Sequence, residues 1–345
     1  MFVGGPRRSL TILTGIFFAR ALKMPNLKSS KKKRTMKGRF APSPSGRMHL
    51  GNVYSAVLSW LSARKQGGSW LLRIEDLDRQ RCRQQFAEQI EDDLQWLGLE
   101  WDEGGSRGGQ AGPYYQSQRS EIYQHAMESL SAQNLIYPCY CSRADIMASS
   151  APHQSDGMVI YNGRCRNLTV EQRRTLGMRR KPAWRIIVPN TESLFSDMHY
   201  GPQQLNLATD CGDFIVQRSD GNFAYQLAVV ADDALMGVTE VVRGCDLLQS
   251  THQQLYLYNK LGYSAPQFAH LPLLMSVEGC RLAKRDTAAG MDALRAAHTP
   301  EQLLGIVGYL ARIINKPCAI SLSELISEFS WSKIPLANQT VDLHI

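Results

Sequence analysis

Short apolar strands alternate with helical stretches from Gly38 onward, and this alternation limits the folds that the chain can adopt. A strand at 39–41 leads through a turn rich in Pro, Ser and Gly into a helical stretch with apolar residues at spacings of three and four. A second strand, 70–74, ends in a cluster of acidic residues. Strands separated by helices are typical of a parallel α/β sheet, so we predict that fold class.

The same alternation predicts the order of the later elements. Helices are expected at 80–97, at 117–134 with Ser117 or Ser120 as the cap, and at 250–261. The rhythm is interrupted at 136–205, which we interpret as an insertion, and it resumes with a strand, a hairpin turn and an apolar run at 213–217, 220–221 and 223–230. Strands at 238–242 and near 271–275 follow. The predicted regions are a leader (1–37), a first catalytic half (38–135), the insertion (136–205), a second catalytic half (206–290) and a helical C-terminal region (291–345).

The charge of the chain is concentrated at its start. The formal net charge is +8, but residues 1–37 hold ten Lys and Arg and no acid, which leaves 29 cations and 31 anions in the body. A polyanion site in the body must therefore be a local patch. Eight cysteines in 345 residues are too few for a disulfide scaffold and fit a reducing compartment. Five of them are expected to be buried small hydrophobic residues: Cys82, Cys211, Cys245, Cys280 and Cys318.

The stretch 39–52 is the first candidate binding site, because it runs from a strand through a turn into the start of a helix. The N–H groups of a first helical turn are unpaired and the helix dipole favours negative charge, so an anion is expected there. Gly51 would let a nucleotide approach the backbone, and His49 and Asn52 would supply donors. From the residues alone, it is equally possible that His49 only caps the helix.

This stretch resembles the His-Ile-Gly-His signature of class I aminoacyl-tRNA synthetases, in the form used by the glutamyl and glutaminyl group. That group carries the run Arg-Phe-Ala-Pro-Ser-Pro-(Ser/Thr)-Gly ahead of the signature, and the run occupies 39–46 here. The resemblance implies a Rossmann-like catalytic sheet and an ATP site at His49, Gly51 and Asn52. It also implies that the turn contributes to a glutamate site through Arg39, Phe40, Ala41, Pro42 and Ser43.

The second class I signature, Lys-Met-Ser-Lys-Ser, has a weaker match at 281–285, which reads Arg-Leu-Ala-Lys-Arg. The resemblance implies that Lys284 contacts the ATP phosphates, so His49 and Lys284 are the expected catalytic residues, with Mg²⁺ carried by ATP. Arg281 and Ala283 replace the first lysine and the first serine, which keeps the charge and removes a hydroxyl. Without the resemblance, this motif would be interpreted as a solvated basic loop.

The acidic strand end at 73–78 is similar to the family's Arg-Ile-Glu-Asp segment. Parallel sheets bind ligands at the carboxyl ends of their strands, and Glu75 could accept a hydrogen bond from an α-ammonium. Tyr225 and Arg243 match the amino-acid pocket of glutamyl enzymes. Guanidinium groups bind carboxylates bidentately, so Arg39 and Arg243 are expected to hold the two carboxylates of glutamate, and which arginine binds which is open. Three further acids are expected to have structural or ribose-side roles: Asp232, Asp233 and Asp246.

Three cysteines form a metal candidate inside the insertion. Cys139, Cys141 and Cys165 lie within 27 positions, which suggests one structural Zn²⁺ per chain rather than unliganded buried thiols. His153 lies between them and is the usual kind of fourth ligand. The Cys-x-Cys…Tyr-x-x-x-Cys arrangement instead resembles the glutamyl-queuosine tRNA(Asp) synthetases, a subfamily whose fourth ligand is a tyrosine oxygen, and so implies Tyr161.

The region after residue 290 favours the same subfamily. Only about 55 residues follow, too few for the anticodon-binding region of glutamyl-tRNA synthetases. The resemblance implies a monomer that activates L-glutamate with ATP and esterifies queuosine in the anticodon arm of tRNA(Asp), which we expect between the insertion and the C-terminal helices. Two alternatives are a minimal glutamyl-tRNA synthetase and an inactive paralogue that binds RNA, for which the altered 281–285 segment is the main support.

The leader, 1–37, permits two interpretations. Its apolar run at 10–18 is similar to a secretory signal, and its Arg and Ser content to a transit peptide. We favour an upstream start codon or a basic tail, with Met24 or Met36 as the usual first residue, because export would separate the protein from ATP. No stretch approaches the ~20 apolar residues of a membrane-spanning helix, so no membrane is expected as a partner. A cytoplasmic protein is predicted, because the few cysteines and the need for ATP fit that compartment.

Overall fold

The structure is a computed structural model that describes Met1 and residues 35–341, apart from 143, 147–159, 281 and 283–288. Most of the expected leader therefore lies outside the described residues, as do His153 and Lys284. No helix in the described part of the chain is long and apolar enough to cross a membrane. The following account concerns the compact unit that begins at Thr35.

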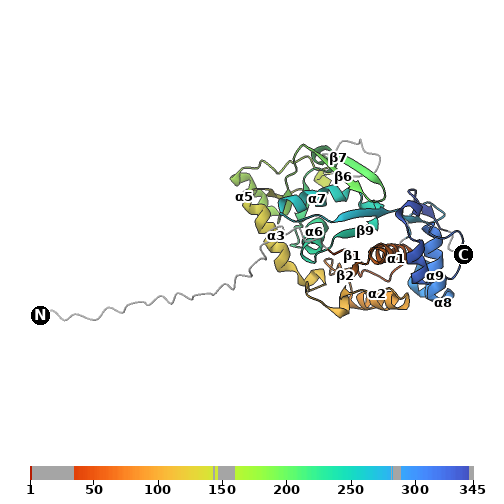
Figure 1. The fold of residues 1–345 in the computed structure, drawn as a ribbon. Coiled ribbons are helices and arrows are strands. Elements are labelled where there is room, and N and C mark those ends of the chain that lie inside the picture. Colours follow the sequence, from red (N-terminus) through yellow and green to blue (C-terminus); the bar gives the residue numbers. More distant parts are fainter. Residues whose placement is uncertain (2–34, 143, 147–159, 281, 283–288, 342–345) are drawn as a thin grey trace. The chain divides into compact units, whose positions relative to one another are not determined.

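A parallel sheet forms the centre of this unit, as the sequence predicts (Figure 1). Three strands pair in the order β1 (Lys37–Phe40), β2 (Ser69–Leu72) and β3 (Glu103–Gly104), and β9 (Glu240–Gly244) pairs in parallel with β10 (Gln267–Leu271). The two groups meet where the backbone N–H of Thr239 donates to the carbonyl of Lys37, at 2.9 Å. The carboxyl ends of β1, β2 and β9 therefore face the same edge.

Helices cover this sheet, and α1 is the most buried of those beside it. It packs against β1, β2 and β9, and eleven of its sixteen residues are buried, including Val53 and Leu61. The C-terminal helices α9 and α10 pack against its remaining surface. The helices between and after the strands are α1 (Leu50–Lys65), α2 (Gln84–Trp96), α3 (Ser120–Ala132), α6 (Tyr225–Leu235), α7 (Ser250–Lys260), α8 (Met291–Ala297), α9 (Pro300–Leu310) and α10 (Leu322–Glu328).

The prediction that Ser117 or Ser120 caps α3 is wrong. Arg119 occupies the cap position without a side-chain cap bond, and Ser120 is already helical. Ser117 instead donates both its hydroxyl and its backbone N–H to Asp76, at 2.6 and 2.8 Å. A hydroxyl that could have capped a helix therefore fixes the acidic end of the second strand.

The segment 136–205 builds an antiparallel layer of its own. Its elements are β4 (Ile136–Cys139), α5 (Val170–Arg179), β5 (Ala183–Ile186) and the hairpin of β6 (Glu192–Asp197) and β7 (Gly201–Asn206). We expected 213–217 to return to the parallel sheet, but β8 (Phe214–Gln217) pairs antiparallel with β5. Asp213 directs it there, because its carboxylate accepts from the Val188 N–H and its carbonyl from Arg185. A small parallel pair, β11 (Leu274–Met275) and β12 (Gln339–Thr340), was not anticipated.

A buried ionic network joins α6 to the edge of the parallel sheet. Arg73, which is fully buried, donates to Asp233 at 2.6 Å and to Glu75 at 3.0 Å. Asp232 accepts from Arg119 at 2.6 Å and from the Tyr123 hydroxyl at 2.9 Å. Buried charges are tolerated when they are paired and hydrogen-bonded, so these contacts fix the position of α6 against the second strand. The arrangement agrees with a structural role for Asp232 and Asp233.

This network predicts a large cost for removing one of its charges. Asp232→Asn leaves the buried Arg119 guanidinium without a carboxylate partner, so the free energy of unfolding should fall by about 3–5 kcal/mol. Urea denaturation followed by circular dichroism measures the change. Asp92→Asn is the matched control, because Asp92 is exposed in its ion pair with Arg295 and should contribute at most about 1 kcal/mol. Equal stability of the two variants would contradict a central role for the network.

Candidate active site

His49 lies at the N-terminus of α1 and caps that helix. Its Nδ1 atom accepts a hydrogen bond from the backbone N–H of Gly51 at 3.1 Å, while Asn52 Oδ1 accepts from the His49 N–H at the same distance. A ring whose Nδ1 accepts a hydrogen bond carries its hydrogen on Nε2, which makes Nε2 a donor. Capping and donating are therefore compatible in one orientation of the ring, and the two interpretations of His49 need not exclude each other.

Glycine is favoured at position 51 for a structural reason that the sequence did not reveal. A Cβ atom at this position would lie 2.9 Å from Cε1 of the His49 ring, closer than real contacts allow. Gly51 therefore leaves room for the imidazole in its capping orientation. After the second signature, the chain returns to the N-terminus of α1. The Met291 N–H donates to the Met48 carbonyl at 3.0 Å, and Gly290 forms a β-bridge with His49.

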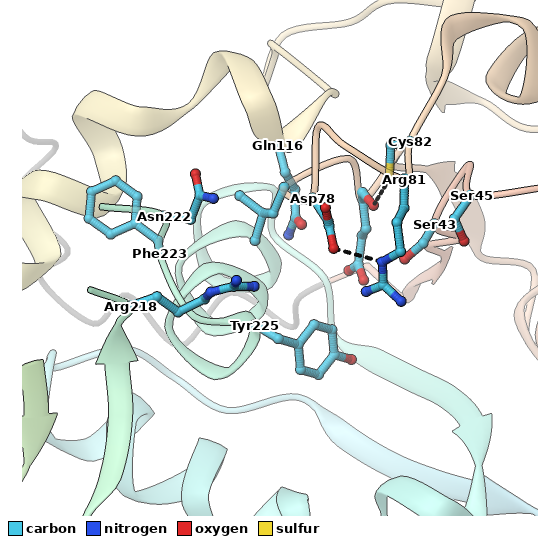
Figure 2. A pocket seen from close by; sticks show the side chains of 12 residues that line it. Ser43, Ser45, Asp78, Arg81, Cys82, Gln116, Arg218, Asn222, Phe223 and Tyr225 are labelled. Atoms are coloured by element: carbon cyan, nitrogen blue, oxygen red, sulfur yellow. Dashed lines mark hydrogen bonds and ion pairs between the residues drawn. The ribbon is translucent and has the colours of Figure 1, made fainter. Parts of the chain in front are cut away.

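A cavity of about 260 Å³ opens at the carboxyl ends of β1 and β2. Figure 2 shows its lining side chains, which come from four segments, one of them represented by Gln116 alone. Ser43 and Ser45 follow the first strand, and Glu75, Asp78 and Arg81 follow the second. The third wall is formed by residues around the β8–α6 turn, namely Arg218, Asn222, Phe223 and Tyr225. The cavity therefore joins the predicted Glu75 and Tyr225 to polar groups that we did not predict.

Two buried arginines lie beside Tyr225. Arg39 donates from Nη1 to the Val242 carbonyl at 3.1 Å, and its Nε lies 3.7 Å from an Asp233 oxygen. Arg243 is likewise buried, and its guanidinium lies over the Phe268 ring at 5.3 Å. Within the described part of the chain, Arg39 Nε and Arg243 Nη1 are buried without a hydrogen-bond partner. Arg39 Nε faces the Asp233 carboxylate, whereas Arg243 Nη1 has no such partner among the described residues. Unpaired buried donors are rare in proteins, so Arg243 Nη1 indicates a ligand that supplies an acceptor.

The electrostatics of Glu75 and Tyr225 connect the cavity to these arginines. Burial raises the pKa of Glu75, and the charges of Arg73 and Arg39 oppose that shift. Burial also raises the pKa of Tyr225, reinforced by Glu75 and opposed by Arg243 and Arg39. The structure therefore brings together one carboxylate, one hydroxyl and two guanidinium groups, which match the charges of an amino acid with an acidic side chain.

Not every residue expected in the site points into it. The ring of Phe40 stacks on Trp70 in the core, with centroids 5.9 Å apart, and only its carbonyl reaches the site's framework by accepting from the Arg73 N–H at 3.0 Å. The Pro42 carbonyl accepts from the Glu75 N–H at the same distance. Ala41 lies between them on the turn. Lys284 lies outside the described residues, so the structure does not locate its ammonium.

Sequence reasoning missed the groups that support the site. Arg73 was visible in the acidic motif and was not assigned a role, although it bonds both Glu75 and Asp233. Two adjacent aspartates within an apolar helical run were a usable signal, because buried acids require cationic partners. Arg218 and Asn222 carried no signal, since polar residues near a glycine turn are common on surfaces.

The three insertion cysteines meet, as predicted for a metal site. The sulfur atoms of Cys139, Cys141 and Cys165 all lie within 4.8 Å of one another, and two of them are 3.6 Å apart. Four ligands around a tetrahedral ion with metal–sulfur distances of about 2.3 Å place sulfurs about 3.8 Å apart. The cluster therefore fits one metal ion of that kind.

Tyr161 is placed as the fourth member of this cluster. Its hydroxyl oxygen lies 3.4 Å from the Cys139 sulfur and 3.8 Å from the Cys141 sulfur, and it accepts from the Cys165 N–H at 2.8 Å. Burial opposes ionisation of Cys139, but its hydrogen bonds with Tyr161 and Arg185 hold its pKa below the ordinary value. The geometry agrees with Tyr161 as a ligand, while His153 lies outside the described residues.

The prediction for the five scattered cysteines is wrong. Cys280 and Cys318 are exposed, and Cys82, Cys211 and Cys245 are partly exposed. Cysteine is often buried as a small hydrophobe, but these positions fall on loops and element ends, where the core covers them at most in part, as it does Cys211.

Comparisons with known proteins agree with this arrangement. A family model described as tRNA synthetases class I (E and Q), catalytic domain, matches residues 35–332. The Glutamyl-Q tRNA(Asp) synthetase of Symbiobacterium thermophilum is 51% identical over 303 residues, which cover 86% of this chain and 93% of that protein. A protein of the same name from Nitratidesulfovibrio vulgaris is 48% identical over 280 residues, 81% of this chain and 86% of the relative.

A solved structure shows the same fold. The crystal structure of a glutamate tRNA ligase from Elizabethkingia meningosepticum in complex with its amino acid superimposes with a TM-score of 0.77 at 29% identity. The match covers 90% of this chain and 68% of that one.

The cysteine cluster predicts metal binding that a spectrum can detect. Added to metal-free protein, Co²⁺ should give the intense absorption of a tetrahedral thiolate site at about one ion per chain. Cys141→Ser should abolish that absorption, and Tyr161→Phe should weaken binding while His153→Ala should not. Cys318→Ser is the control, because this exposed thiol lies outside the cluster. A weakened His153→Ala variant beside an intact Tyr161→Phe variant would assign the fourth position to His153.

Proposed function

The chain belongs to the class I tRNA synthetases of the glutamyl and glutaminyl group, and from this premise we propose that it activates L-glutamate with ATP and transfers the glutamyl group to queuosine in tRNA(Asp). It is a ligase of that class by its family. The single observation that carries the choice of amino acid is the pair of buried guanidinium groups beside Tyr225, those of Arg39 and Arg243. One nitrogen of Arg243, Nη1, has no hydrogen-bond partner in the described part of the chain. The names of the relatives support the choice of acceptor.

The proposed reaction has two steps. A glutamate α-carboxylate oxygen attacks the α-phosphorus of ATP, the bond to the β-phosphate breaks, and pyrophosphate leaves. A hydroxyl of the queuosine ring then attacks the carbonyl of the glutamyl-adenylate, its proton is released, and AMP departs. Neither step requires a covalent bond to the protein, so catalysis would consist of positioning and charge stabilisation.

The proposed amino-acid pocket would supply a group for each charge of glutamate. Glu75 would accept from the α-ammonium at the cavity wall, and Arg39 and Arg243 would bind the carboxylates, with the Tyr225 hydroxyl as a neutral donor. Because an amide cannot neutralise a buried guanidinium, glutamine should bind more weakly than glutamate by about 2–5 kcal/mol. Aspartate is one methylene too short to span the same groups.

The ATP site would use the start of α1. The dipole of α1 and the His49 Nε2 donor would favour the negative charge of the phosphates, and Gly51 leaves room for the ring in its capping orientation. The Lys284 ammonium would contact the ATP phosphates as negative charge develops on them during the reaction. Mg²⁺ would enter the site bound to ATP.

The acceptor would enter through the mouth of the cavity. Arg218, Asn222, Phe223 and Asp78 line the same cavity as Tyr225 (Figure 2). An aromatic ring beside polar groups suits an unstacked base and its hydroxyls. In this proposal, the acceptor hydroxyl and the amino acid would share one continuous space.

Helix α5 offers a surface for the RNA backbone. The only acid on this helix is Glu171. Exposed cations lie on the helix and beside it: Arg164, Arg174, Arg179, Arg180 and Lys181. The body as a whole is slightly acidic, so this segment is the kind of local patch that a polyanion requires. Phosphate contacts of this type position an RNA without reading its sequence.

The metal in the insertion would be one structural Zn²⁺ per chain. Three thiolates and the Tyr161 oxygen would complete four protein ligands, which leaves no open position for catalysis. Zinc would supply folding free energy to a segment that has only a small core of its own.

The first step predicts glutamate-dependent exchange of pyrophosphate into ATP without tRNA. His49→Ala and Lys284→Ala should each lower this activity by ~10²-fold or more, because they remove donors that stabilise the transition state, while folding is retained. His125→Ala and Lys316→Ala are matched controls at exposed positions. Normal exchange by Lys284→Ala would show that the second signature is misplaced, and absence of exchange in the native chain would refute the proposed activation.

The second step predicts dependence on the modified base. Radiolabelled glutamate should be transferred to tRNA(Asp) that contains queuosine and not to tRNA(Asp) that lacks it. An isolated anticodon stem-loop bearing queuosine should also accept glutamate, since the proposal needs no acceptor stem. If only full-length tRNA with an intact 3′ adenosine accepts glutamate, the chain is a minimal glutamyl-tRNA synthetase.

A further inference from the structure

Arg243 is held by two of its three side-chain nitrogens. Nε donates to His270 Nε2 at 3.1 Å, and Nη2 donates to Thr251 Oγ1 at 2.8 Å. Nη1 is buried and has no hydrogen-bond partner among the described residues. The protein thus fixes the plane of the guanidinium and leaves one nitrogen for a ligand.

His270 reaches Arg243 because of strand register. The two residues are direct partners in the parallel pair β9 and β10, so their side chains emerge side by side. His270 is itself fixed from its other nitrogen, because Nδ1 lies 2.6 Å from Asp197 Oδ2. Asp197 can accept only from a protonated Nδ1, so the neutral ring carries its hydrogen there and presents Nε2 as an acceptor to Arg243.

Asp197 is rigidly held at the end of the β6 strand. Its Oδ1 accepts from the backbone N–H groups of His199, Tyr200 and His270 at 3.0, 2.9 and 3.2 Å. These bonds and the one from His270 lower the pKa of Asp197 although burial opposes its ionisation. Burial lowers the pKa of His270, and Arg243 adds to that shift while Asp197 opposes it.

We propose that His270, oriented by Asp197, and Thr251 are positioning residues that hold Arg243 so that its Nη1 atom binds a carboxylate of the amino-acid substrate. This inference rests on the proposed function for the identity of the substrate. It adds three residues to the site, one of which comes from the inserted segment 136–205. That segment therefore contributes to amino-acid binding as well as to the metal cluster.

The test separates positioning from general stability. Thr251→Val removes the acceptor of Nη2 at nearly constant volume, whereas Thr251→Ser keeps a hydroxyl. In glutamate-dependent pyrophosphate exchange, Thr251→Val should raise the KM for glutamate about tenfold or more, as expected for a lost hydrogen bond to a charged group. Its kcat and its KM for ATP should change by less than about twofold, and Thr251→Ser should restore most of the affinity. Thr175→Val, on an exposed turn of α5, is the matched control.

A second measurement does not depend on activity. In ¹⁵N NMR of the native protein at pH 7, the His270 ring, assigned by its loss in His270→Gln, should be neutral with its hydrogen on Nδ1. A hydrogen on Nε2, or an unchanged glutamate KM in a folded Thr251→Val variant, would overturn the proposal. Equal losses in kcat and in ATP binding would also overturn it, by indicating a structural role. If the native chain does not activate glutamate, the proposed function fails, and the tautomer alone decides whether His270 orients Arg243.

Discussion

The buried pairing of two adjacent aspartates on α6 with arginines from the surrounding elements is the constraint on which the site depends. Asp233 binds Arg73 and lies 3.7 Å from Arg39, and Arg73 in turn binds Glu75. Each of these charges would be costly to bury alone, so they are stable only together. The network therefore fixes Arg39 and Glu75 in position before any ligand arrives, which reduces the entropy that binding must overcome.

Much of the parallel sheet was predictable, because its strands and helices differ in hydrophobic period and follow one another regularly. The alternation at Gly38 and beyond placed β1, α1 and β2 in the correct order. The assignment of β8 failed because a four-residue apolar strand does not reveal its partner. That choice depends on Asp213, whose long-range hydrogen bonds to Arg185 and Val188 draw the strand into the antiparallel layer.

The candidate site was likewise predictable only in part. Glu75, Tyr225, Arg39 and Arg243 came from motifs. The structure places Glu75 and Tyr225 on the wall of one cavity, and the charges of Arg39 and Arg243 act on Tyr225. The residues that orient them were invisible, because neither strand register nor the docking of the β6–β7 hairpin can be derived from spacing. His270 illustrates this: it lies 27 positions from Arg243 in the chain, yet it is its direct neighbour in the sheet.

A crystal structure with L-glutamate tests the central claim most directly, namely that the buried guanidinium groups of Arg39 and Arg243 bind the substrate's carboxylates, with Arg243 Nη1 as the nitrogen left for that contact. One carboxylate oxygen should lie about 2.7–2.9 Å from Arg243 Nη1, and the α-ammonium should lie at Glu75. The guanidinium should keep its bonds to His270 and Thr251. Glutamate bound elsewhere, or an Arg243 that turns away from these partners to meet it, would contradict the account.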